Sequence, residues 1–499
     1  MAEYTAISNV VVIGHGVSLS MMAALLGHGL TRHSKTITVV QLPDMANDCD
    51  VVISGPEFAA LCDILKLPIE QVISHCVEGF SLGMCYHKDQ RSWFVPFGNM
   101  GLVEGAAYFN QGILRALKDE LLPELQWQHL SLAAQAVSAG KFAIAGPKQT
   151  HLQGPLQYAV TLNRQAYRAL LQQIAQQAGI KIIATASITP TYHETGAISD
   201  LTLDNGQIVK GDFFIDCSVG DRLTPKVVDA IEANQPSIIT MSWVQNTPVK
   251  HQFGCQHLVS TPWGWIRQTQ AKDKWHFYTV FESTQWTASQ VESWLSEQGF
   301  SDIERLSVAT LSGEALAQPM QQNYLAVGKV VMDLGELVFS ELVVVQQAII
   351  TLLDHFPINN NWSIHNRIYN RAWQVVLSEA EAFIDLHSSH FMVRGAKTTL
   401  AKNLVARFGR LGSLPTLQYD IVSESQWFSL MLGLGISPKL PCHYLSNISD
   451  TELQSTLSSL RQYILNIVNG MPSYVDFCSQ VIPNTLHCPL RRQEAGSHG

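Results

Sequence analysis

The first fifty residues show a change of hydrophobic period that predicts two strands around one helix. Residues 9–13 form a short β-branched run that ends at a glycine, which is typical of a buried strand. Residues 18–29 have the apolar spacing of a helix, and residues 36–42 form a second β-branched run. A strand, a glycine turn, a helix and a second strand make a βαβ unit, which is how a dinucleotide-binding fold begins.

The next part of the chain alternates between strand and helix patterns. Residues 74–98 carry aromatic and β-branched patches around a polar turn at residues 88–90, which indicates strands. Residues 163–179 form an amphipathic helix, with Asn163 as the expected N-cap and Gly179 at its C-terminal end. The remaining elements are a small sheet over residues 180–218 with a hairpin turn at 204–206, strands over 238–283, a strand, turn and long helix over 324–355, and helices from residue 363 onward.

Composition narrows the class of protein. The chain has 499 residues, of which 46% are hydrophobic and 15% charged, so a large core is expected and disorder is not. The net charge of −9 and the lack of a Lys/Arg-rich run argue against a nucleic-acid partner. No apolar run reaches the roughly 18–20 residues of a membrane span, and no signal peptide precedes the first strand. We expect a cytoplasmic location. The nine cysteines include no CxxC pair, so we expect no metal site and no disulfide framework.

Five further segments are informative when their order and spacing along the chain are taken together. They are FIDCS at 214–218, PWGWIR at 262–267, the strand, turn and helix at 325–349, AFIDLHSS at 382–389, and SESQWFSLMLGLGISP at 423–438. Together they resemble the flavin-dependent tryptophan halogenase family over roughly residues 7–445. The resemblance implies a flavin-monooxygenase-like α/β fold, a Rossmann-type FAD domain with a mixed substrate sheet, followed by a helical C-terminal region.

The resemblance also implies domains and chemistry. Residues 1–355 would form the FAD-binding-type region, with substrate sheets inserted at 74–160 and 238–320, and residues 356–499 the helical region. Members of the family take reduced FAD from a separate flavin reductase and react it with oxygen. They oxidise chloride or bromide to hypohalous acid, which passes to a lysine and a glutamate beside an aromatic substrate such as tryptophan.

The glycine turn keeps part of the dinucleotide fingerprint. Gly14 permits the tight turn, and Gly16 lets the backbone approach a pyrophosphate. Leu19 replaces the third glycine, and Gln41 stands where an acidic residue would bind the ribose. The alternative is a βαβ unit retained only for folding. His15 stands in place of a small residue and is a candidate phosphate contact. The resemblance adds three further positions that correspond to flavin contacts, namely Ser18, Asp216 and Gly328.

The catalytic positions depart further from the family. In the segment GFSLG, Ser81 occupies the place of the family lysine, and Lys88 is better explained as a surface charge. Glu336 aligns with the family glutamate when one inserted residue is allowed, and Ser340 then aligns with the family serine. A glutamate there would act as a general base, or it would simply stabilise the start of the following helix.

Two tryptophans and one histidine complete the candidates. Trp263 and Trp265 alternate along a predicted strand, so both would point to one face. They would wall off the substrate, or they would fill the core of the sheet. His276 alternates with aromatic residues and fits a half-buried structural histidine. Two functions stay open: a divergent FAD-dependent halogenase-like oxidoreductase for an indole-like substrate, and a non-catalytic relative that binds a ligand or a partner protein.

Overall fold

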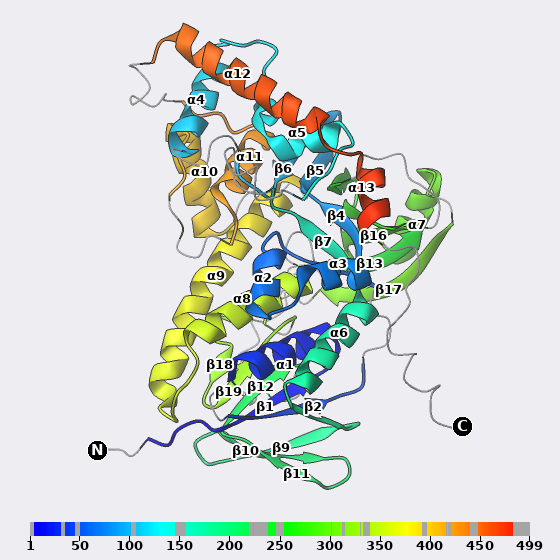
Figure 1. Ribbon diagram of the computed structural model, residues 1–499, viewed down its shortest axis with the longest axis vertical. Helices are drawn as coiled ribbons and strands as arrows, with labels where there is room; N and C mark the ends of the chain where they lie inside the picture. Colours follow the sequence, from blue (N-terminus) through cyan, green and yellow to red (C-terminus); the bar gives the residue numbers. More distant parts are fainter. Residues whose placement is uncertain are drawn as a thin grey trace.

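The computed structural model describes most of the chain. The described residues are 4–30, 35–44, 50–100, 106–144, 156–218, 223, 238–245, 254–272, 274–300, 302–311, 315–329, 331–332, 340–391, 397–415, 417, 421–439 and 448–482. Figure 1 shows a mixed α/β molecule with its nucleotide-fold sheet at one end and the helices α4, α5 and α12 at the other. The expected fold class is therefore confirmed.

A six-stranded sheet forms around the predicted βαβ unit. Its order is β18-β19-β12-β1-β2-β8, and β1 pairs in parallel with both β2 and β12. Residues 10–14 are all buried, as expected for a parallel strand covered on both faces. The strand bounds are β1 Asn9–Gly14, β2 Thr36–Gln41, β8 Lys181–Ala184, β12 Phe213–Cys217, β18 Met320–Gln321 and β19 Tyr324–Ala326.

Three helices cover one side of this sheet, and a small antiparallel sheet lies on the other (Figure 1). The helices are α1 Gly16–Leu30, α6 Arg164–Gln177 and α8 Glu341–Asp354. The small sheet consists of β9 Ile188–Tyr192, β10 Ile198–Leu203 and β11 Ile208–Lys210. Asn163 caps α6, accepting a 2.9 Å hydrogen bond from the Ala166 amide, and Gly206 has φ +78° in the predicted hairpin turn. Residues 181–184 and 213–217 join the larger sheet instead of the small one.

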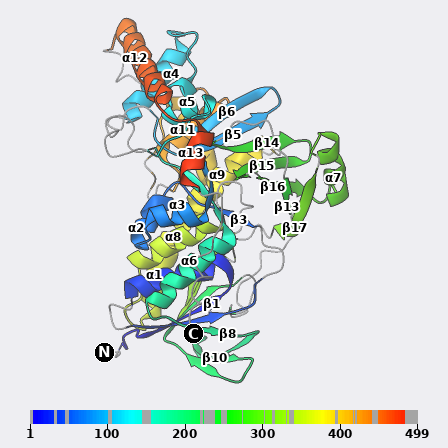
Figure 2. The same ribbon diagram turned by 45° about the vertical axis from the view of Figure 1, so that its right-hand side comes forward.

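A seven-stranded sheet forms the second layer, which Figure 2 shows at the right. Its order is β17-β13-β16-β15-β14-β5-β6, and all its pairs are antiparallel except β14 with β5. The bounds are β5 Gly83–Lys88, β6 Arg91–Pro96, β13 Ile238–Gln245, β14 Gln256–Thr261, β15 Gly264–Ala271, β16 Lys274–Glu282 and β17 Ile303–Leu311, with α7 at Ala288–Glu297. The predicted turn at residues 88–90 joins β5 to β6, and the first predicted strand begins later than residue 74 because α3 runs to Cys76.

A three-stranded sheet lies between the two larger ones (Figure 1). Its strands, β3 Val51–Ile53, β7 Ala159–Asn163 and β4 Val77–Ser81, are antiparallel and adjoin α2 Phe58–Ile64 and α3 Ile69–Cys76. β4 runs directly into β5 and so passes from this sheet to the seven-stranded one. Ser81, the last residue of β4, therefore lies at the boundary between the two sheets.

The second half of the chain is mainly helical, as expected from residue 363. Its helices are α9 Trp362–Phe391, α10 Thr399–Leu411, α11 Glu424–Gly433, α12 Asp450–Asn469 and α13 Tyr474–Val481; α4 Ala106–Lys118, α5 Leu132–Ser138 and a 3-10 turn at Trp127–Leu130 pack among them. The buried hydroxyl of Tyr474 accepts a hydrogen bond from the Phe80 amide at 3.0 Å, so α13 returns to β4. Within the described residues, no helix combines the length and apolar character needed to span a bilayer.

Candidate functional site

The turn between β1 and α1 has the backbone shape of a dinucleotide-binding turn. Gly14 has φ +141°, and a Cβ there would lie 2.5 Å from the carbonyl carbon of Cys217. Gly16 has φ +70°, and a Cβ there would meet no atom within 4 Å. The first glycine is thus required by packing against β12, whereas the second faces open space at the start of a helix. Such a position lets a ligand phosphate approach backbone amides. Leu19 is 2% exposed in the main core, so α1 accommodates a side chain where a third glycine would stand.

Two polar atoms at this turn have no hydrogen-bond partner among the described residues. Nε2 of His15 is buried between the two glycines, and Oγ of Ser218 is buried just beyond the neighbouring strand β12. The Ser218 amide lies 2.8 Å from the Cβ position of Gly14, so this residue adjoins the turn. Buried polar atoms without partners cost free energy, and a polar ligand would satisfy them. The residues at this turn therefore fit a phosphate-bearing group such as FAD.

The ends of the neighbouring strands β2 and β12 have no free carboxylate, among the described residues, that could accept a hydrogen bond from a ribose. Gln41 is the last residue of β2 and pairs with Gly14, and its half-buried side chain makes no hydrogen bond to other described residues. Asp216 is 1% exposed, and its carboxylate is already engaged. It accepts from the Ser218 amide at 2.8 Å and from the Tyr324 hydroxyl at 3.3 Å. Asp216 therefore fixes the end of β12, and Gln41 is the side chain left to face a ligand.

A carboxylate reaches the first turn of α1. Oε1 of Glu341, the first residue of α8, accepts a 2.5 Å hydrogen bond from the Ser18 hydroxyl, and Oε2 lies 3.0 Å from Nη1 of Arg164. Burial alone would raise the pKa of Glu341. Arg164, Lys329 and the hydrogen bond from Ser18 outweigh that effect and lower the pKa to about 2. An ion pair of Glu341 with Arg164 thus lies beside the N-terminus of α1, with its carboxylate toward the helix.

Two of the expected positions between β19 and α8 lie in the described residues, and a third does not. Gly328 has φ +91°, and its Cβ position lies 3.5 Å from Oγ of Ser18, so it adjoins the same turn of α1. Ser340 is the N-cap residue of α8, but its hydroxyl donates to the carbonyl of Ile53 and makes no capping bond. It therefore ties the start of α8 to β3. Glu336, the candidate general base, lies outside the described residues.

Ser81 is buried, 4% exposed, and pairs with Ala159 of β7. The residue before it, Phe80, packs against Phe142 at 5.1 Å between ring centroids and against Phe477 at 5.4 Å. These aromatic contacts hold the end of β4 rigidly. Lys88 lies seven residues away at the end of β5, in the hairpin turn. A serine thus stands where the family resemblance predicts a lysine, and Lys88 lies on a different strand.

The expectation that Trp263 and Trp265 share one face is wrong. Trp263 precedes β15, and Gly264, the first residue of the strand, has φ +153°. Trp263 packs edge-on against Trp294 at 5.6 Å, within a separate aromatic cluster over the seven-stranded sheet. Trp265 belongs to the main core and contacts Tyr278 at 6.2 Å. The strand starts one residue later than the alternation predicts, so the two indoles fill different cores.

Sequence reasoning missed two groups of buried polar residues. The first is Glu341 with Arg164, which are 177 residues apart and carry no local signal. The second is Cys85, Cys255 and His257, whose donor atoms all lie within 4.8 Å of one another. A signal for the second group exists, because the triplet Cys-x-His occurs twice, once on β5 and once at the start of β14, where Cys255 directly precedes the strand. His276, which was expected to be half-buried, is 7% exposed, and burial lowers its pKa to about 4.

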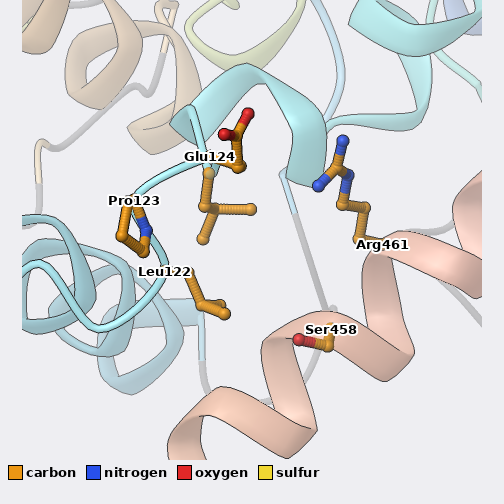
Figure 3. Close-up of a pocket in the computed structure, with 6 residues that line it drawn as sticks. Leu122, Pro123, Glu124, Ser458 and Arg461 are labelled. Atoms are coloured by element: carbon orange, nitrogen blue, oxygen red, sulfur yellow. The ribbon is translucent and has the colours of Figure 1, made fainter.

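A small surface hollow lies far from the glycine turn (Figure 3). It is bounded by Leu122, Pro123 and Glu124 on one side and by Ser458 and Arg461 of α12 on the other. Figures 1 and 2 both place α12 at the opposite end of the molecule from α1. This hollow therefore takes no part in the candidate site.

Comparison with known proteins identifies the family. The sequence matches the model for "Tryptophan halogenase" over residues 9–450. The chain belongs to the tryptophan halogenase family. Among solved structures, it is similar to a flavin-dependent halogenase from Brevundimonas sp. BAL3, with a TM-score of 0.83 and 19% identity over 96% of this chain and 99% of that one.

Two further solved structures share the fold. A flavin-dependent halogenase from Xanthomonas campestris has a TM-score of 0.81 and 19% identity, over 96% of this chain and 99% of that one. A tryptophan halogenase from Shewanella frigidimarina NCIMB 400 has a TM-score of 0.80 and 15% identity, over 96% and 98%. No curated protein matches the sequence. The expected family is confirmed.

Proposed function

We propose that this protein is a divergent FAD-dependent oxidoreductase that acts on an indole-like aromatic substrate and does not halogenate free tryptophan. The observation that carries the flavin part is the turn at Gly14–Gly16, where Nε2 of His15 and Oγ of Ser218 are buried and have no hydrogen-bond partner in the part of the chain that the structure describes. Family membership supports the same cofactor. Reduced FAD, when bound, supplies the reaction with oxygen, and a separate flavin reductase would provide it.

The chain's own residues then have distinct roles. The amides at the start of α1 and Nε2 of His15 would bind the pyrophosphate, and Gln41 would accept a hydrogen bond from the ribose. An uncharged amide accepts more weakly than a carboxylate, so affinity for FAD should be low. Ser81, held at the end of β4 by the packing around Phe80, cannot provide the cationic donor that would hold and polarise hypohalous acid.

A second function is favoured by Glu341. Its carboxylate already accepts the hydrogen bond of the Ser18 hydroxyl in the first turn of α1, so that hydroxyl is not available to a diphosphate at the same helix end. On this reading the protein keeps the fold and binds a ligand or a partner protein without flavin chemistry. The two functions differ in a single measurable property, namely the binding of FAD at the glycine turn.

Equilibrium dialysis with FAD under anaerobic, reducing conditions distinguishes them. Gly16→Ala places a methyl group in the open space at the turn, and it should weaken FAD binding at least about tenfold. Gly140→Ala is the matched control, because Gly140 has φ +64° and a similarly open Cβ position, 124 residues along the chain. Both variants carry the same backbone strain, of order 1 kcal/mol. Equal FAD binding by both variants, or none by the unmodified protein, would reject the flavin-dependent function.

A further inference from the structure

The side chains of two adjacent strands bring four sulfur and imidazole groups together. β5 and β14 pair in parallel, with Cys85 opposite His257. β5 carries Cys85-x-His87, and Cys255-x-His257 runs from the residue before β14 into that strand; residues two apart along extended chain face the same side. Cys85, His87, Cys255 and His257 therefore lie on one face of this strand pair. Cys85 is 6% exposed, Cys255 is 4% exposed and His257 is 1% exposed, so these three side chains are buried.

The donor atoms converge. Sγ of Cys85 lies 2.8 Å from Sγ of Cys255, and Sγ of Cys255 lies 3.5 Å from Nε2 of His257. The sulfur atoms are not joined as a disulfide, whose bond is about 2.05 Å long. All three donor atoms lie within 4.8 Å of one another, which is the spacing of ligands around one cation. Two sulfurs and one imidazole nitrogen form a soft donor set, which selects Zn²⁺ or Cu⁺ over Mg²⁺ or Ca²⁺.

A hydrogen-bond relay orients the imidazole. Nδ1 of His257 lies 3.0 Å from Nε2 of His87, and Nδ1 of His87 lies 3.0 Å from Oγ of Ser92. When Nδ1–H of His87 donates to Ser92, Nε2 of His87 carries no proton and accepts a hydrogen bond from Nδ1–H of His257. Nε2 of His257 is then unprotonated, and its lone pair faces the thiol of Cys255. Metal-binding histidines commonly have their second nitrogen held in this way. A disulfide or a pair of buried thiols would need no such arrangement.

We propose that Cys85, Cys255 and His257 bind a zinc ion, with His87 as a positioning residue. Two thiolates neutralise a divalent cation, so the buried site would carry no net charge and cost little desolvation. Zinc lies about 2.3 Å from each thiolate in tetrahedral sites, so binding would move the sulfurs about 1 Å further apart. Three protein ligands leave one position for a non-protein ligand.

The ion would join the two strands that form the parallel pair of the seven-stranded sheet. Cys85 is four residues from Ser81, and the peptide between them carries β4 into β5. Zinc would therefore fix the end of β4 at the boundary of the candidate site. The proposal does not depend on flavin binding, since it rests on residues that do not contact the glycine turn.

Metal analysis of the whole protein tests this site directly. The protein is purified under reducing conditions from zinc-supplemented cells, and zinc is measured by mass spectrometry. We expect about one zinc per chain, and at least a tenfold lower content in Cys85→Ser and Cys255→Ser. Cys62→Ser is the control, because Cys62 is equally buried but belongs to a different part of the core, and it should keep the metal.

The relay gives a second test. His87→Leu should weaken zinc binding about 10- to 100-fold in competition with a chromophoric chelator, and His87→Gln, whose amide oxygen can accept from Nδ1, should restore most of it. If the cysteine variants do not fold, cobalt titration of the chelator-treated unmodified protein should still give a sulfur-to-cobalt charge-transfer band. Absence of both zinc and this band overturns the proposal. So does a Cys85–Cys255 disulfide found by alkylation and peptide mapping.

Discussion

The carboxylate of Glu341 and the hydroxyl of Ser18 are joined by a 2.5 Å hydrogen bond that links the first turn of α8 to the first turn of α1. The residues are 323 positions apart, and Arg164 of α6 binds the other carboxylate oxygen at 3.0 Å. Three helices that cover the same sheet therefore meet at one charge. The bond stabilises the fold, and it places a carboxylate beside the glycine turn.

Acid should destabilise the protein through Glu341. The folded-state pKa is lowered to about 2 from an ordinary value of 4.5, so the stabilisation is complete above pH 4.5 and is lost as the pH falls toward 2. The shift corresponds to a contribution on the order of 3 kcal/mol. Urea unfolding at a series of acidic pH values, for the unmodified protein and for Glu341→Gln, measures it. The difference between the two should shrink through this range, and a constant difference would contradict the assignment.

Glu341→Gln should also destabilise the protein at neutral pH by about 3 kcal/mol, because Arg164 would stay buried without its counter-charge. The matched control is Glu292→Gln, which removes the acid of an exposed ion pair with Arg305. Exposed pairs contribute less than about 1 kcal/mol. Thermal unfolding of both variants should separate them clearly. If they lose equal stability, Glu341 is not part of a buried pair.

Restoring an acidic residue at the end of β2 should strengthen flavin binding. Gln41→Glu supplies a charged ribose acceptor, and this contact should contribute about 1–3 kcal/mol. Leu19 is left in place, because it is 2% exposed in the main core and its removal would open a cavity there. Flavin fluorescence quenching reports the dissociation constant. Gln207→Glu, in the β10–β11 hairpin, adds the same charge away from the turn and should have no effect. A Gln41→Glu variant that binds FAD no tighter than the unmodified protein would contradict the assignment of Gln41 to the ribose.

The unmodified protein should not halogenate tryptophan when reduced FAD, oxygen and chloride or bromide are supplied. Ser81 lacks the cationic donor, and loss of such a positioned donor costs about 10²–10³ in rate. Mass spectrometry of the products measures this directly, and robust halogenation would refute it. Ser81→Lys should gain activity if the rest of the site is intact. Ala159→Lys, its partner across β4 and β7, is the positional control and should gain none.

Tyr474 should anchor the C-terminal helix to the candidate site. Its hydroxyl accepts from the Phe80 amide at 3.0 Å and donates to the Phe80 carbonyl at 3.3 Å. Tyr474→Phe leaves both buried backbone groups without this partner and should cost about 1–3 kcal/mol. Hydrogen exchange of the Phe80 amide should rise more than that of Val160 on the neighbouring strand. Unchanged exchange at Phe80 would show that water replaces the hydroxyl.

Local patterns predicted much of the fold, because strands and helices here follow their hydrophobic periods. The βαβ unit, the helix capped by Asn163 and the hairpin turn at Gly206 all form as expected. The two tryptophans were assigned to one face because alternation assumes an unbroken strand, whereas Gly264 begins the strand after Trp263. A single residue of offset was enough to place the indoles in different cores.

The candidate site was only partly accessible to sequence reasoning. Gly14 and Gly16 could be found because a tight turn needs glycine locally. The Glu341–Arg164 pair could not, because each residue looks like an ordinary charge until three helices converge. The repeated Cys-x-His triplet is visible in the sequence. Its meaning depends on the parallel pairing of β5 with β14, which no local pattern specifies.

That parallel pairing bears on how the chain reaches its native state. Cys85 and Cys255 are separated by 170 residues, and β14 lies far beyond β5 in the order of synthesis. Closing so long a loop carries a large entropy penalty before any contact compensates it, and such non-local pairings slow folding. During translation, β5 can pair with β6 early, but its other edge stays unpaired until β14 has been synthesised, which requires more than half of the chain. An unpaired strand edge favours pairing with other chains, so this interval exposes the nascent protein to aggregation.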